Sequence, residues 1–124
     1  LYWYTKNDSG SNGLFKAPVP AEGDTITASS ITQILASEDY NPSGLAIDGM
    51  GNVYMMVGWG NSTLVRVTPA GAVEEVWELP TENPNKAVWH ENKLYVAAGN
   101  QGNEVYVIYL GPDYGTGAVP QNTW

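Results

Sequence analysis

Ser43 and Asn85 are the two residues whose type and spacing best suit the binding of a metal ion. Each is the third residue of an Asn-Pro-x motif, and the two motifs lie 42 residues apart. Serine hydroxyl and asparagine amide oxygens are ligands that a hard cation such as Ca²⁺ accepts. The pair therefore predicts a divalent cation site, although for each residue alone a turn-capping role is the more common outcome.

Three further residues could contact a substrate beside such a site. Trp59 stands between two glycines, where its ring could stack on a sugar or fill a crevice in the core. Asn61 and Asn100 belong to polar loops, and we predict that they bind substrate together with Trp59. Asn7 and Asn61 each begin an Asn-x-Ser/Thr sequence, which predicts glycosylation if the protein is secreted by a eukaryote.

The sequence lacks the residue patterns of most other kinds of catalytic site. The sequence has no cysteine and a single histidine, His90, which we expect in a turn. Asp48 precedes Gly49 and is expected to stabilise a tight turn rather than to act in catalysis. The sequence holds no nucleophile elbow, no phosphate-binding glycine loop and no set of ligands with zinc spacing. Any catalysis is therefore expected to be metal-assisted.

Composition narrows the class of protein and its partners. A chain of 124 residues with 43% hydrophobic residues allows one packed domain. The net charge of -8 disfavours nucleic acid and anionic membrane surfaces as partners. No apolar run is long enough to span a membrane as a helix. Few lysines, no cysteines and many Asn, Thr, Tyr and Gly residues favour an extracellular or secreted protein.

Short apolar runs separated by Gly, Asn and Asp clusters indicate strands joined by tight turns. Residues 31–36 have a helix-like spacing, but their alignment within a repeat favours a strand. The expected strands are 1–5, 13–19, 31–36, 44–48, 53–57, 64–68, 73–79, 87–89, 94–98 and 105–110, followed by a tail that contains glycine and proline.

The chain repeats itself with a period near 41 residues. The segment Asn41–Ala46 matches Asn83–Val88, and Tyr54 falls on Tyr95. Four strands in about 40 residues are typical of one blade of a β-propeller. The sequence thus predicts an all-β, single partial propeller domain with blade-like repeats at about 1–40, 41–82 and 83–124. The innermost strand of the first repeat is missing.

The blade pattern sorts the candidate residues between two faces. Because successive strands are antiparallel, the connections before the first strand and after the second lie on the same face. Ser43 and Asn85 would then begin the innermost strands, beside the loops that hold Trp59, Asn61 and Asn100. His90 would lie on the opposite face.

Three blades leave a propeller incomplete, since closed propellers have roughly four to eight blades. Open sheet edges and uncovered sheet faces favour pairing with other chains. We therefore expect a partner, which is either a missing N-terminal half of the propeller or a second copy of the chain.

A family resemblance rests on motifs that follow one another through the second repeat. The segments Pro42–Asp48, Gly51–Tyr54, Gly58–Gly60, Leu64–Arg66 and Pro69–Gly71 resemble the gluconolactonase family, also called senescence marker protein or regucalcin-like. The resemblance covers most of the chain and corresponds to the C-terminal half of the family's propeller.

The resemblance implies a six-bladed propeller that holds one divalent cation, usually calcium, and hydrolyses lactones or related esters. The family's Pro-Asp-Gly motif supplies a metal ligand and general base, and Ser43 takes the place of that aspartate. Serine cannot accept a proton near neutral pH as a carboxylate can. We expect a lactone hydrolase, or a decayed relative, that works only with the other propeller half. The alternative is a non-catalytic propeller module that binds carbohydrate or protein on the same loop face.

Overall fold

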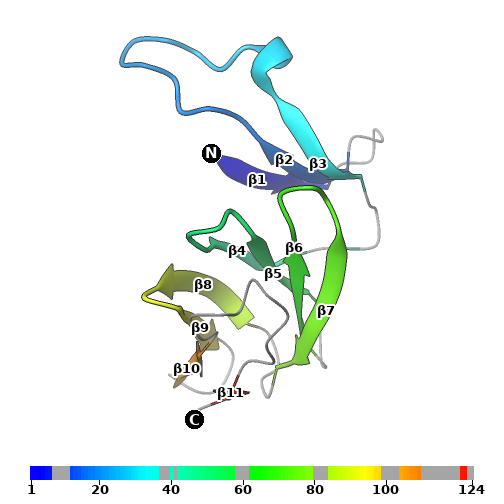
Figure 1. Ribbon diagram of the computed structural model, residues 1–124, viewed down its shortest axis with the longest axis vertical. Helices are drawn as coiled ribbons and strands as arrows, with labels where there is room; N and C mark the ends of the chain where they lie inside the picture. The colour runs from blue at the N-terminus through cyan, green and yellow to red at the C-terminus, as the bar shows by residue number, and fades with distance from the viewer. Residues whose placement is uncertain are drawn as a thin grey trace. The chain divides into compact units, whose positions relative to one another are not determined.

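The computed structural model describes residues 1–6, 12–36, 40, 42–57, 62–79, 84–98, 104–109 and 121–122. These residues form three antiparallel β-sheets and one short 3-10 helix (Figure 1). The prediction of an all-β fold is confirmed. By internal contacts the chain divides into two compact units, Leu1–Asn41 and Pro42–Trp124. Within the described part, no helix is long and apolar enough to cross a membrane.

The first unit contains one sheet of three strands in the order β1-β2-β3. The 3-10 helix η1 (Ala28–Ser30) lies between the second strand and the third. The aromatic rings of Trp3 and Phe15 are cross-strand partners and stack with their centroids 5.8 Å apart. The strand bounds are β1 (Tyr2–Thr5), β2 (Gly13–Lys16) and β3 (Thr32–Ala36).

The second unit contains two sheets of four strands each, both built as antiparallel meanders. Each sheet falls inside one sequence repeat, as expected for propeller blades. The first sheet consists of β4 (Gly44–Ile47), β5 (Val53–Val57), β6 (Thr63–Val67) and β7 (Val73–Glu78). The second consists of β8 (Pro84–His90), β9 (Lys93–Ala98), β10 (Glu104–Tyr109) and β11 (Gln121–Asn122).

The end of the chain differs from the sequence prediction. The sequence predicts only a tail after residue 110, whereas Gln121 pairs with Tyr109 and Asn122 pairs with Ile108. This short strand, β11, occupies the fourth position of its sheet. A two-residue strand without apolar alternation leaves no periodic signal in the sequence, so only the pairing with β10 reveals it.

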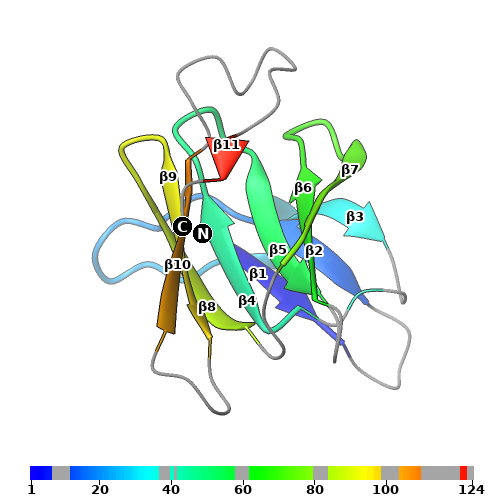
Figure 2. The same cartoon turned by 90° about the horizontal axis from the view of Figure 1, so that it is seen from below.

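Apolar side chains join the two four-stranded sheets. Strands β4 and β8, the edge strands of their sheets, lie side by side in both views (Figures 1 and 2). Such an arrangement is that of the innermost strands of consecutive blades. We call the buried cluster between the sheets the seam; it comprises Ala46, Tyr54, Met56, Leu64, Leu79, Ala87, Leu94, Val96 and Ile108, with Trp89 and Tyr106 packed against it.

Gly44 marks the closest approach of the two sheets. A Cβ atom added there would lie 2.5 Å from Met56 Cε and 3.1 Å from both the Asn85 carbonyl oxygen and Lys86 Cα. The methionine end could move away, but the two backbone atoms of β8 could not move without shifting that strand. Only glycine therefore allows this spacing of β4 and β8.

Asp48 organises the turn between β4 and β5. Its Oδ1 atom accepts hydrogen bonds from the backbone amides of Met50 and Asn52, both at 2.9 Å. Its Oδ2 atom accepts from the Asn52 side-chain amide at 2.8 Å and from the Tyr54 hydroxyl at 3.0 Å. The prediction that Asp48 stabilises a turn is confirmed.

Replacing Asp48 by alanine should lower the free energy of unfolding by about 2 kcal/mol, because several hydrogen bonds to one carboxylate are lost together. Urea unfolding followed by circular dichroism measures the change. Asp24→Ala is the matched control, since the Asp24 side chain is exposed and lies in a loop. Equal effects of the two substitutions would contradict the structural role given to Asp48.

Replacing Gly44 by alanine should destabilise the protein by about 1 to 3 kcal/mol, the usual cost of overpacking a core. Gly49→Ala serves as the control, because its Cβ would come no nearer than 3.3 Å to a ring carbon of Trp89. The same unfolding measurement compares the two variants. A Gly44 variant as stable as the Gly49 variant would show that β4 and β8 are not so closely packed.

Candidate functional site

Ser43 connects the two sheets of the second unit at the beginning of β4. Its backbone amide donates to the Met56 carbonyl oxygen at 2.9 Å. Its hydroxyl donates within its own sheet to the same carbonyl at 3.4 Å and across the seam to the carbonyl of Pro84. The single hydroxyl proton is thus used by the backbone, while the lone pairs of Oγ remain available because Ser43 is exposed.

Asn85 lies at an irregularity of the strand register in β8. Pro84 pairs with Ala98 and Lys86 pairs with Ala97, so Asn85 is the extra residue of a β-bulge. Bulges change the direction of a side chain at the rim of a sheet. The Asn85 side chain is exposed, and its backbone carbonyl lies next to Gly44.

The structure therefore brings Ser43 and Asn85 together at the same end of two adjacent inner strands. The contact between Ser43 and Pro84, the residue before Asn85, fixes this arrangement. The role of the two residues as cation ligands stays a prediction.

The loops that hold the other candidate residues begin at this same end of the sheets. Met56, near the end of β5, pairs with Gly44, and Ala98 at the end of β9 pairs with Pro84. Trp59, Asn61 and Asn100 follow these strand ends but lie outside the described residues, as does Asn7. Their predicted roles in substrate binding and glycosylation stay predictions.

The opposite end of the sheets holds Asp48 and His90. His90 ends β8 five residues after Asn85, which corresponds to about 16 Å along an extended strand. The His90 side chain is exposed, with Nε2 3.7 Å from Glu91 Oε1. Glu91 and Asn92 have positive φ angles of 47° and 60°, as a tight hairpin turn requires. His90 therefore lies in a hairpin, away from Ser43 and Asn85.

Ser43 and Asn85 both offer neutral oxygen atoms. Among the described residues, no group of three or more His, Cys, Asp or Glu side chains could hold a metal ion. Ser43 and Asn85 can supply a hydroxyl and an amide oxygen, which suit calcium, but Ca²⁺ takes six to eight oxygen ligands. The pair can therefore form only part of a calcium site.

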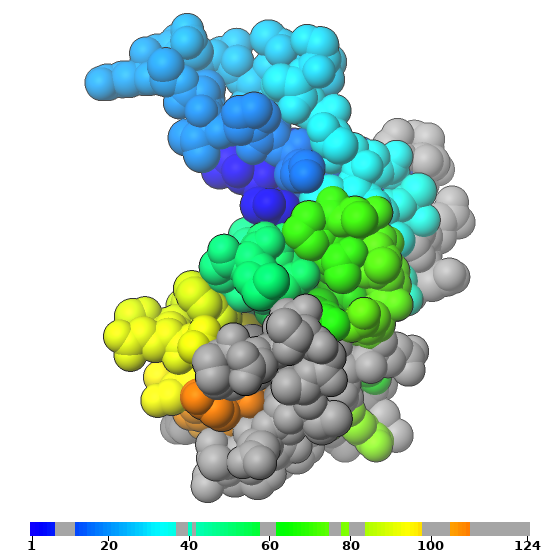
Figure 3. All heavy atoms as spheres, viewed as in Figure 1, coloured from blue at the N-terminus to red at the C-terminus, as the bar shows by residue number. Residues whose placement is uncertain are grey.

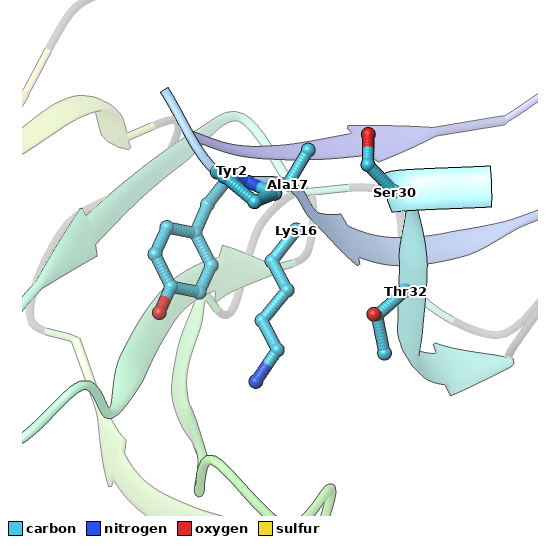
Figure 4. A pocket seen from close by; sticks show the side chains of 6 residues that line it. Tyr2, Lys16, Ala17, Ser30 and Thr32 are labelled. Carbon is cyan, nitrogen blue, oxygen red and sulfur yellow. The ribbon is translucent and has the colours of Figure 1, made fainter. Parts of the chain in front are cut away.

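A separate hollow of about 330 Å³ lies in the first unit (Figure 4). Tyr2, Lys16 and Thr32 are cross-strand partners, so their side chains point to the same side of the sheet. An ammonium group beside hydroxyls can bind an anion or a sugar hydroxyl. This combination leaves no signal in the sequence, because it depends on the register of three strands. The lining residues are Tyr2, Lys16, Ala17, Pro18, Ser30 and Thr32.

Comparison with curated proteins and with solved structures found no match for the chain. A family model described as "SMP-30/Gluconolactonase/LRE-like region" matches residues 1–100. The matched part includes strands β1 to β9 together with Ser43 and Asn85. It covers most of the 124 residues and agrees with the antiparallel blades described above. The chain therefore belongs to the SMP-30/gluconolactonase/LRE-like family of β-propeller proteins.

Proposed function

We propose that the chain forms the cation-binding end of a calcium-supported hydrolase of lactones or related esters, which works together with further propeller blades. The observation that carries this proposal is the position of Ser43 and Asn85. Equivalent residues of two consecutive repeats meet at the start of the innermost strands, held by the hydrogen bond from Ser43 to Pro84. Family membership supports the same conclusion.

The local chemistry at Ser43 and Asn85 fits part of a calcium site. Ser43 offers the lone pairs of an exposed hydroxyl, and Asn85 offers an exposed amide oxygen. Both are ligands of hard cations, but neither carries the negative charge that strengthens calcium binding. The carboxylate ligands of a complete site would have to come from other residues or from other blades.

A bound divalent ion would polarise the lactone carbonyl and lower the pKa of an attacking water. The residues of this chain would orient the ion and the substrate. The Ser43 hydroxyl donates its proton to backbone carbonyl oxygens, and no described base lies beside it. Ser43 would therefore act as a metal ligand rather than as a nucleophile. Without a carboxylate at this position, we expect slow turnover.

Replacing Ser43 by aspartate should raise calcium affinity by about tenfold or more, because the number of charged ligands tunes the affinity of calcium sites. Isothermal titration calorimetry measures calcium binding, and acid release from a gluconolactone substrate, with and without chelator, measures hydrolysis. Ser29→Asp is the matched control, since it adds the same charge at an exposed residue of the first unit. Both calcium binding and chelator-sensitive hydrolysis should increase only in the Ser43 variant.

Asn85→Ala should weaken calcium binding in the Ser43→Asp background by removing an amide ligand. A folded Ser43→Asp protein that binds no more calcium than the unchanged protein would contradict the proposal. Binding of an oligosaccharide by that same protein, lost on substitution of Trp59, would favour a non-catalytic carbohydrate-binding module instead.

A further inference from the structure

The second unit contains a cross-strand group in which a cation is neutralised by a carboxylate of the same sheet. Arg66 of β6 pairs with Tyr54 of β5 on one side and with Glu74 of β7 on the other. Arg66 is only 9% exposed, and its Nη2 atom donates a hydrogen bond to the Glu74 carboxylate within an ion pair. Burying a charge costs much less when the charge is paired in this way. The second unit therefore balances this cation with its own residues.

The first unit has the same group of positions but lacks the carboxylate. Lys16 of β2 pairs with Tyr2 of β1 and with Thr32 of β3. In both sheets, a register shift separates the two residues that precede the cation, so the two groups of three occupy equivalent places. The tyrosine and the cation correspond, whereas the first unit has threonine where the second has glutamate.

Lys16 has no carboxylate partner within the part of the chain that the structure describes. Its ammonium group and the Tyr2 hydroxyl extend in the same direction from the sheet (Figure 4). Both side chains are partly buried. Hydrogen bonds between an ammonium group and a carboxylate are shorter and stronger than those between neutral groups. A carboxylate ligand at this place would therefore supply the interaction that Glu74 supplies to Arg66.

A long connection forms part of the wall of the hollow beside Lys16. Residues 17–31 connect β2 with β3, whereas residues 68–72 suffice between β6 and β7. The longer connection lies at the surface (Figure 3) and contributes Ala17, Pro18 and Ser30 to the lining. The volume of about 330 Å³ falls in the range of roughly 300 to 1,000 Å³ that is typical of small-molecule sites.

We propose that this hollow binds a small carboxylate that carries hydroxyl groups, of about the size of a single sugar acid. The carboxylate of the ligand pairs with Lys16 as Glu74 pairs with Arg66. The hydroxyls of Tyr2 and Thr32 can donate hydrogen bonds to the hydroxyl groups of the ligand and accept hydrogen bonds from them. The site uses residues of the first unit alone, and it does not depend on the cation site proposed above.

Charge favours a monoanion over other ligands. Lys16 carries the one positive charge among the lining residues, and it can balance a single negative charge. The net charge of -8 opposes ligands with several negative charges, such as polyphosphates or sulfated glycans. A neutral sugar would leave the ammonium group without a counter-charge. A singly charged sugar acid meets both conditions.

Two probes that differ in charge test the choice of ligand. D-Glucuronate and D-glucose share a sugar ring, and glucuronate has a carboxylate where glucose has a hydroxymethyl group. Calcium is first removed on a chelating resin, so that binding at a metal site does not contribute. Ligand-observed NMR titrations of the full chain should then show saturable binding of glucuronate, and binding of glucose should be weaker by about tenfold or more.

Substitutions in the hollow test the role of its charge. Lys16→Gln should weaken glucuronate binding by about tenfold or more, because a charge-assisted hydrogen bond is lost. Lys6→Gln is the matched control, since it removes the same charge from an exposed residue of the first unit that does not line the hollow. Thr32→Glu should abolish binding, because it supplies the carboxylate that the second unit has. Thr32→Gln, of the same size but uncharged, should retain binding.

Circular dichroism verifies that each variant is folded, and Thr32→Glu tests the proposal if Lys16→Gln does not fold. Absence of saturable glucuronate binding would overturn the proposal, as would equal binding of glucose. A folded Lys16→Gln or Thr32→Glu protein that binds glucuronate as tightly as the unchanged protein would do the same. Acetate that competes as strongly as glucuronate would also contradict it, because the hydroxyl groups of the ligand would then contribute nothing.

The two proposed sites can fail separately. Ser43→Asp should leave glucuronate binding unchanged, because Ser43 belongs to the second unit and does not line the hollow. The calcium titration of that variant tests the proposed function, whereas the glucuronate titration of the Lys16 and Thr32 variants tests the hollow.

Discussion

Close packing between β4 and β8 is the constraint on which the rest of the structure depends. Gly44 permits the approach, and the hydrogen bond from Ser43 to Pro84 ties the two sheets at one end. Below that contact, the apolar seam excludes water between Met56, Ala87 and their neighbours. The same approach that packs the core also brings Ser43 and Asn85 together. Fold and candidate site therefore share one cause.

The two ends of the sheets differ in how their polar groups are used. At one end, the Asp48 carboxylate accepts four hydrogen bonds within a tight turn, so its role is structural. At the Ser43 end, a bulge and an exposed hydroxyl leave oxygen atoms open to solvent. Buried or saturated polar groups stabilise a fold, whereas open ones can bind a ligand. This contrast is why we place the proposed cation site at the Ser43 end.

The strands were largely predictable from the sequence, since alternation and the repeat located β5 at Val53–Val57 without error and placed the other blade strands close to their observed ranges. Two features were not. The strand β8 begins at Pro84 rather than at Ala87. Its first residues pair with β9 across a bulge, and a bulge leaves no signal in the amino-acid composition. The pairing of Gln121–Asn122 with β10 depends on contacts between residues distant in sequence.

The candidate site was predictable only in part. The repeat showed that Ser43 and Asn85 are equivalent positions, but only the structure shows the hydrogen bond that joins their strands.

The most direct test of the proposed calcium site is a native mass spectrum of the purified protein, recorded in calcium and again after a chelator has been added. The proposed site predicts that the protein carries calcium and loses the metal on chelation. A protein without bound calcium under both conditions would contradict the calcium site.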